Sequence, residues 1–217
     1  RTREGRDVWL VTLAHAAKTT EVQRPAILIV ANLEADHVVG SQVALELIQR
    51  IASEDGKDDA IGRLLDSATL FVVPRLDPDG VERLLARPAI DLRTNLRPID
   101  RDRDGQRSED GPDDLDGDGQ ITSLLVPDTA ASLIPDDKDP RRLRKADASK
   151  GERGRLSQYV EGLDNDADGN LNEDPPGGVN LNRNWPYRWG EYDPEAGPTP
   201  VGEPETRALI EFAFARP

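Results

Sequence analysis

The chain has 217 residues, which is enough for one hydrophobic core and short for two domains. Its formal net charge of −14 argues against a nucleic-acid partner, because the sequence offers no basic patch to neutralise phosphates. No apolar run approaches a membrane span, and the absence of cysteine excludes disulfides and thiolate metal sites.

Apolar segments and a helical pattern predict a strand, helix and strand early in the chain. Residues 7–14 are β-branched and apolar, and residues 26–32 form a continuous apolar run typical of a buried strand. Residues 38–54 then place apolar side chains on one helical face, and residues 68–74 form another apolar run. This order predicts a parallel or mixed sheet with a right-handed crossover.

The pattern changes between residues 87 and 178, where Asp, Gly, Pro and Arg dominate and only a short helix is expected, at 140–146. A stretch this long inside a compact domain needs another source of order. Residues 204–215 again show helical spacing behind a proline. We therefore expect one α/β domain over residues 1–217, a partial one, with a mixed, largely parallel sheet and flanking helices. A long irregular calcium-binding insertion interrupts it at 98–177.

Three acidic loops in this insertion repeat the pattern D-x-D-x-D-G, at residues 100–105, 114–119 and 164–169. Carboxylates at alternate positions of a tight loop converge on one point, as in a calcium loop of the EF-hand type. The alternative is a solvated acidic linker, but unneutralised carboxylates packed this closely would repel one another. The sequence predicts calcium ligands at Asp100, Asp102, Asp104, Asp114, Asp116, Asp118, Asp164, Asp166 and Asp168.

The usual closing glutamate at position 12 of such a loop is missing in all three cases. The closing ligand must come from elsewhere, so we expect structural sites of modest affinity, suited to calcium-rich surroundings. This favours a secreted or cell-surface protein, extracellular or periplasmic and bacterial. The candidate closing ligands are Glu109, Asp110, Glu173 and Asp174.

Four motifs occur in an order that resembles the zinc carboxypeptidase family. Residues 32–40 read N-L-E-A-D-H-V-V-G, 74–80 read P-R-L-D-P-D-G, 178–186 read G-V-N-L-N-R-N-W-P, and 197–206 end in E-P-E-T. The family's matching segments contain H-x-x-E, N-P-D-G, D-L-N-R-N-F and S-E-P-E-T. The resemblance implies an active site at the carboxyl ends of the central strands.

The resemblance also implies roles for three polar residues. Asn182 and Arg183 match the pair that holds the substrate's terminal carboxylate, which suits a planar guanidinium with a neighbouring amide. The alternative for Arg183 is a structural salt bridge. The arginine that polarises the scissile carbonyl maps onto Arg93, with Arg97 as the alternative.

The metal motif departs from the family pattern, because Glu34 and His37 stand in exchanged order. Either residue type binds zinc, although a site built for one order would be misfitted to the other. The alternative is a polar pair, with a neutral His37 near the start of the following helix. His15, the remaining histidine, is expected to be an ordinary surface or loop residue.

The sequence supports more than one function. A catalytic zinc needs about three protein ligands, and we assign no catalytic residue within this chain, because the family's third histidine and its general base follow the matched motifs. One possibility is a zinc-dependent exopeptidase acting on peptide or protein C-termini, of which this chain is a fragment or an altered form. The other is a non-catalytic, calcium-stabilised extracellular scaffold or assembly module, with self-association possible.

Overall fold

The computed structural model describes residues 1–15 and 24–215, and the chain divides into two compact units. The core unit comprises Arg1–Ala86, Ile90–Ile99 and Pro176–Pro217. The acidic unit comprises Arg87–Ala89 and Asp100–Pro175, most of the segment expected as an insertion. Among the helices of the described ranges, none has the length and apolar character needed to span a bilayer.

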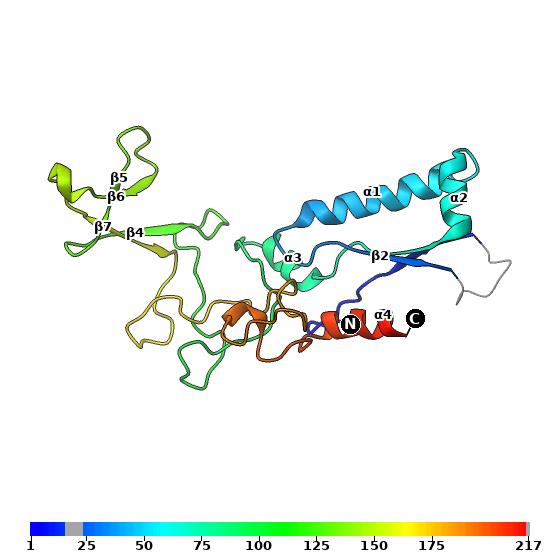
Figure 1. The fold of residues 1–217 in the computed structure, drawn as a ribbon. Helices are drawn as coiled ribbons and strands as arrows, with labels where there is room; N and C mark the ends of the chain where they lie inside the picture. The colour runs from blue at the N-terminus through cyan, green and yellow to red at the C-terminus, as the bar shows by residue number, and fades with distance from the viewer. Residues whose placement is uncertain (16–23, 216–217) are drawn as a thin grey trace. The chain divides into compact units, whose positions relative to one another are not determined.

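The core unit is built on a three-stranded mixed sheet in the order β1-β3-β2 (Figure 1). Strand β2 (Ala26–Val30) runs parallel to β3 (Thr69–Val73), and β1 (Val11–Leu13) pairs with β3 in the antiparallel sense. Helix α1 (Val38–Glu54) connects the parallel strands, together with α2 (Asp59–Ser67). The mixed α/β fold is confirmed, and the strand predicted at 7–14 is shorter than expected.

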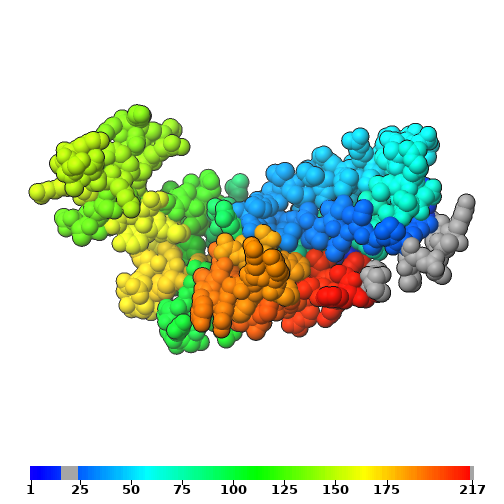
Figure 2. Space-filling view, viewed as in Figure 1, coloured from blue at the N-terminus to red at the C-terminus, as the bar shows by residue number. Residues whose placement is uncertain are grey.

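Strand β3 lies between two apolar clusters because successive side chains of a strand point to opposite faces. Leu70 packs with Ile51 of α1 and Leu65 of α2. On the other face, Val73 packs with Leu209 of α4 (Pro204–Phe214). The C-terminal segment, drawn in red in Figure 2, accordingly lies against the first part of the chain, in blue. The helix predicted at 204–215 is thus confirmed, and it covers one face of the sheet.

Two helices of the core unit were not expected from the sequence. Asp58 is the N-cap residue of α2, and its side chain accepts a hydrogen bond from the Ala60 backbone at 2.7 Å. Asp77 caps helix α3 (Pro78–Leu84) in the same way, with 2.9 Å to the Gly80 nitrogen. Both aspartates satisfy an otherwise free N–H of the first turn.

The acidic unit contains a four-stranded antiparallel sheet in the order β4-β7-β5-β6, so the prediction of a long irregular insertion is wrong for this part. The prediction of a helix at 140–146 is also wrong, since strand β6 (Leu143–Lys145) lies in that segment. Pairing with a neighbouring strand, which local spacing does not show, decides its conformation. The strands are β4 (Ser123–Pro127), β5 (Leu133–Pro135), β6 (Leu143–Lys145) and β7 (Leu156–Val160).

Candidate metal and substrate site

The exchanged metal pair lies in the turn that leads from β2 into α1. Asn32 adopts a left-handed backbone conformation with φ 56°, and its side-chain amide donates a hydrogen bond to the Glu34 carbonyl at 2.9 Å. His37 is the N-cap residue of α1, and its carbonyl accepts from the Gly40 nitrogen at 3.0 Å. The end of the strand and the start of the helix therefore position both candidate ligands.

Glu34, Asp36 and His37 form a group whose possible metal-ligating atoms all lie within 4.8 Å of one another. The His37 Nε2 atom is 3.4 Å from Glu34 Oε2 and 3.8 Å from Asp36 Oδ1. Asp36 was not predicted as a ligand, and its place between the two predicted ligands is the signal that marks it. The turn therefore offers two carboxylates and one imidazole to a cation.

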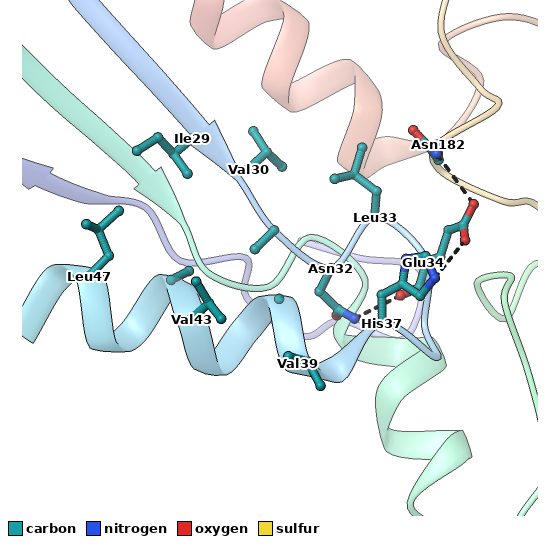
Figure 3. A pocket seen from close by; sticks show the side chains of 13 residues that line it. Ile29, Val30, Asn32, Leu33, Glu34, His37, Val39, Val43, Leu47 and Asn182 are labelled. Atoms are coloured by element: carbon teal, nitrogen blue, oxygen red, sulfur yellow. Dashed lines mark hydrogen bonds and ion pairs between the residues drawn. The ribbon is translucent and has the colours of Figure 1, made fainter.

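Glu34 is held from the other side by two asparagine amides. Asn180 donates to Glu34 Oε1 over 3.1 Å, and Asn182 donates to the same oxygen over 3.4 Å, the latter bond being drawn in Figure 3. Burial raises the pKa of Glu34, but these hydrogen bonds and the nearby His37 and Arg93 outweigh it, so the net pKa is lowered. The carboxylate therefore stays ionised, as a metal ligand must. Asn180 was not predicted; the alternation of asparagines at 180, 182 and 184 is the signal that marks it.

The two candidates for the carbonyl-polarising arginine have different environments. Arg93 is largely exposed, and its Nε lies 3.2 Å from Asp36 Oδ2, at the candidate site. Arg97 instead contacts the fully buried Glu203, with 2.6 Å between Nη1 and Oε1. Of the two candidates, Arg93 is therefore the one that contacts the group formed by Glu34, Asp36 and His37.

Arg183, the predicted carboxylate-binding residue, is half-exposed and already contacts two carboxylates of its own chain. Its Nη1 lies 2.8 Å from Asp193 Oδ2 and 3.6 Å from Glu195 Oε2. Both partners belong to the short turn around Pro194–Ala196. These contacts are the structural salt bridge considered as the alternative for Arg183, and its role as a substrate-carboxylate ligand stays a prediction.

An open pocket of about 430 Å³ adjoins the metal group. Glu34, His37 and Asn182 lie at one end of it, and Figure 3 shows the apolar side chains of Val43 and Leu47 along α1. An apolar wall with a few polar groups at one end is typical of small-ligand sites.

His15, the other histidine, contacts Asp55 and Asp66 and not the candidate metal ligands. Its Nε2 is 2.8 Å from Asp55 and its Nδ1 is 2.9 Å from Asp66. The two ring nitrogens are thus engaged between the end of α1 and α2, in a specific ion-pair arrangement.

Seven of the nine predicted calcium ligands fall into two sets. In the second acidic loop, Asp114 accepts hydrogen bonds from the backbone of Gly117, Asp118 and Gly119. Asp164 of the third loop accepts from the backbone of Asp168 and Gly169 in the same manner. By contrast, further carboxylates of the first and third loops gather in groups that could hold a cation; they are Asp100, Asp102, Asp104, Asp166 and Asp168.

Sequence comparison identifies the family of the chain. A sequence model of the zinc carboxypeptidase family matches residues 1–113 and 141–216, which is most of the chain. The chain therefore belongs to the zinc carboxypeptidase family.

Individual relatives agree with this assignment. Carboxypeptidase M of Mus musculus is 35% identical over 78 residues, covering 36% of this chain and 18% of that protein. Carboxypeptidase D of Homo sapiens is 28% identical over 112 residues, covering 51% of this chain and 8% of that protein. The chain thus spans less than a fifth of either relative.

A solved structure shares the fold. The crystal structure of thrombin activatable fibrinolysis inhibitor superimposes with a TM-score of 0.51 at 12% sequence identity. The superposition covers 99% of this chain and 37% of that one. At this identity the likeness concerns the fold alone.

Proposed function

We propose that this chain supplies the metal-binding and substrate-binding residues of a zinc exopeptidase site that recognises the C-terminal ends of peptides. The observation that carries the proposal is the meeting of Glu34, Asp36 and His37 in one turn, with Asn182 donating to Glu34. Membership of the family supports zinc as the cation.

The donor set fits zinc. Zinc accepts carboxylate and imidazole ligands, and catalytic sites combine about three protein ligands with an open position. Asn180 and Arg93 contact Glu34 and Asp36, as outer partners that orient metal ligands do. A bound zinc ion would activate a water molecule and polarise the scissile carbonyl. The exchanged order of glutamate and histidine is then compensated by Asp36, which supplies a further carboxylate.

Arg183 is the proposed anchor for the terminal carboxylate of the peptide. A guanidinium binds a carboxylate through two parallel N–H donors, which gives both charge and orientation. In the structure Asp193 and Glu195 contact Arg183 through Nη1. A peptide carboxylate would share or replace these contacts, while the apolar wall of the pocket receives the adjoining side chain.

The second candidate function is a non-catalytic scaffold that binds peptide C-termini without cleaving them. The exchanged metal pair favours it, as do the carboxylates already paired with Arg93 and Arg183. Both functions include calcium binding by the acidic loops and a calcium-rich extracellular or periplasmic setting, which we propose from the loop sequences.

The test compares an N-acetylated dipeptide that has a free carboxylate with the same dipeptide amidated at its C-terminus. Calorimetry on the zinc-loaded full chain should show binding of the acid only, and Arg183→Met should weaken that binding at least about tenfold, since a charge-assisted pair is lost. Arg207→Met, on an exposed position of α4, is the matched control. Equal binding of the amide would contradict the proposal, and chromatography of the products separates cleavage from binding alone.

A further inference from the structure

Carboxylates of the first and third acidic loops lie in shared groups, although the loops are far apart in the sequence. Asp102 of the first loop groups with Asp166 and Asp168 of the third, with ligating atoms within 4.8 Å of one another. Asp104 also groups with Asp166. The two loops therefore approach one another closely enough for their side chains to coordinate the same cation.

Asp174 gives an independent sign of a missing partner at this place. Its side chain is fully buried, and its Oδ1 accepts a hydrogen bond from the Arg101 backbone at 2.5 Å. Its Oδ2 has no hydrogen-bond partner among the described residues, and the carboxylate groups with Asp102 and Glu109. Burying a carboxylate oxygen unpaired is costly unless a cation compensates it. The two shielded oxygens of Glu109 likewise find no hydrogen-bond partner there.

Asp110 shows what a satisfied carboxylate looks like in the same unit. It too is fully buried, but one oxygen accepts from the Asn165 backbone at 3.0 Å and the other from the Glu173 backbone at 3.3 Å. Asp110 therefore fastens the third loop by direct hydrogen bonds. Asp174 lacks the second bond, so the two buried aspartates have different roles.

The second acidic loop is stabilised differently. The carboxylate of Glu161 accepts hydrogen bonds from the backbone of Leu115 at 2.7 Å and of Thr122 at 3.0 Å. Together with the three backbone N–H groups that donate to Asp114, these bonds stabilise the second loop.

We propose that the first and third acidic loops form a single calcium centre, closed by Glu109, Glu173 and Asp174, with the second loop outside it. Calcium takes six to eight oxygen ligands in a flexible geometry, which suits a convergent set of carboxylates. The closing residues replace the glutamate missing from position 12 of each loop. This inference deepens the proposed calcium binding and rests on it.

The experiment uses calcium alone, with equilibrium dialysis and calorimetry of the full chain. Asp102, Asp116 and Asp166 all occupy the third position of their loops, so Ala substitutions at them are matched. In a shared centre, Asp102→Ala and Asp166→Ala weaken the binding of the same calcium at least about tenfold, because each removes a charged ligand. The double variant then loses no more ions than either single variant. Asp116→Ala leaves the affinity of this centre unchanged.

Glu109→Gln provides a second variant. Glu109 groups with aspartates of the first loop and with Asp166 of the third, so its substitution should weaken the binding of the same calcium. Circular dichroism confirms that each variant remains folded. Independent losses at positions 102 and 166 that add in the double variant would overturn the shared centre while calcium binding stands. Loss of this same centre in Asp116→Ala would do the same. A wild-type chain that binds no calcium would overturn both the centre and calcium binding, whatever the zinc site does.

Discussion

At the scale of single residues, two glutamates of the E-P-E-T motif show how burial acts on carboxylates in the core unit. Glu203 is fully buried and accepts hydrogen bonds from Arg3, Arg97 and Asn95. Burial raises its pKa, but the three donors outweigh burial and lower it overall. Glu205, two residues further on, has both carboxylate oxygens buried without a hydrogen-bond partner among the described residues. Two glutamates of one motif therefore have environments of opposite effect: that of Glu203 lowers its pKa and favours the charged form, and that of Glu205 raises its pKa and favours the neutral form.

Glu203→Gln should destabilise the protein. The substitution keeps the shape of the side chain but leaves two partly buried guanidinium groups without their counter-charge. Removing one partner of a buried pair costs about 3 kcal/mol, which should appear in the free energy of unfolding in urea. Glu211→Gln, on an exposed position of α4, the helix that Glu203 precedes, is the control and should change stability little. Equal stability of the two variants would contradict the structural role of Glu203.

Glu205→Gln should change how stability depends on pH. Burial, with the nearby Asp77, Glu203 and Asp79, raises the pKa of Glu205 to about 7. The folded state therefore holds the proton more tightly than the unfolded state, so this group makes wild-type stability fall as the pH rises from about 4.5 to about 7.

The free energy of unfolding of Glu205→Gln, relative to that of the wild type, should therefore rise by about 2–3 kcal/mol between pH 5 and pH 8. Urea unfolding at the two pH values measures this difference. A pH-independent difference between the proteins would show that Glu205 is ionised in the folded state throughout the range.

The candidate site could be predicted only in part at this scale. The order of the motifs predicted Glu34, His37, Asn182 and Arg183, because each belongs to a short segment with a distinctive sequence. Asp36 was not predicted, because the turn that follows β2 places its carboxylate beside Glu34 and His37. Contacts made by folding, rather than local sequence, thus complete the site.

At the scale of elements, His15 links two helices of the core unit. Its ring lies between Asp55, at the C-terminal end of α1, and Asp66 of α2. The hydrogen bonds from Asp66 and Asp55 raise the pKa of His15 above its usual 6.5. A protonated imidazole donates to both carboxylates at once. The link is therefore strongest when His15 is charged.

His15→Gln should lower the melting temperature most at low pH. The contribution of His15 is fully present below pH 6.5 and is lost as the pH rises through its higher folded-state pKa. The difference in melting temperature between wild type and variant should therefore shrink from pH 6 to pH 9. A difference that is constant or grows over this range would contradict the ion-pair role.

Long periodic segments were predictable, and short ones were not. Helices α1 and α4 and the central strands β2 and β3 show their periods in the sequence. Helices α2 and α3 are short and start at aspartate caps, a weaker local signal. The strands of the acidic unit are three to five residues long, so the pairing of β5 with β6 emerges only from the fold.

At the scale of the whole molecule, the two units should depend differently on cations. The acidic unit contains the crowded carboxylates, and contact with Asp110 together with burial raises the pKa of Glu173 to about 7. The core unit has its own apolar clusters on both faces of its sheet.

Chelation of calcium should therefore loosen the acidic unit selectively. Hydrogen exchange in a calcium chelator should accelerate for backbone amides at 100–110 and 164–174, while amides of β2 and β3 stay protected. Magnesium added in place of calcium provides the control, since it requires a stricter octahedral geometry. Unchanged exchange in the two loops would contradict calcium binding there.

Zinc binding by the turn after β2 is the central claim, and metal analysis of the dialysed full chain tests it most directly. The account predicts one equivalent of zinc in the wild type, lost in His37→Ala and in Glu34→Gln and retained in His15→Gln, whose ring lies with Asp55 and Asp66. A wild-type chain without zinc, or zinc retained in both site variants, would contradict it.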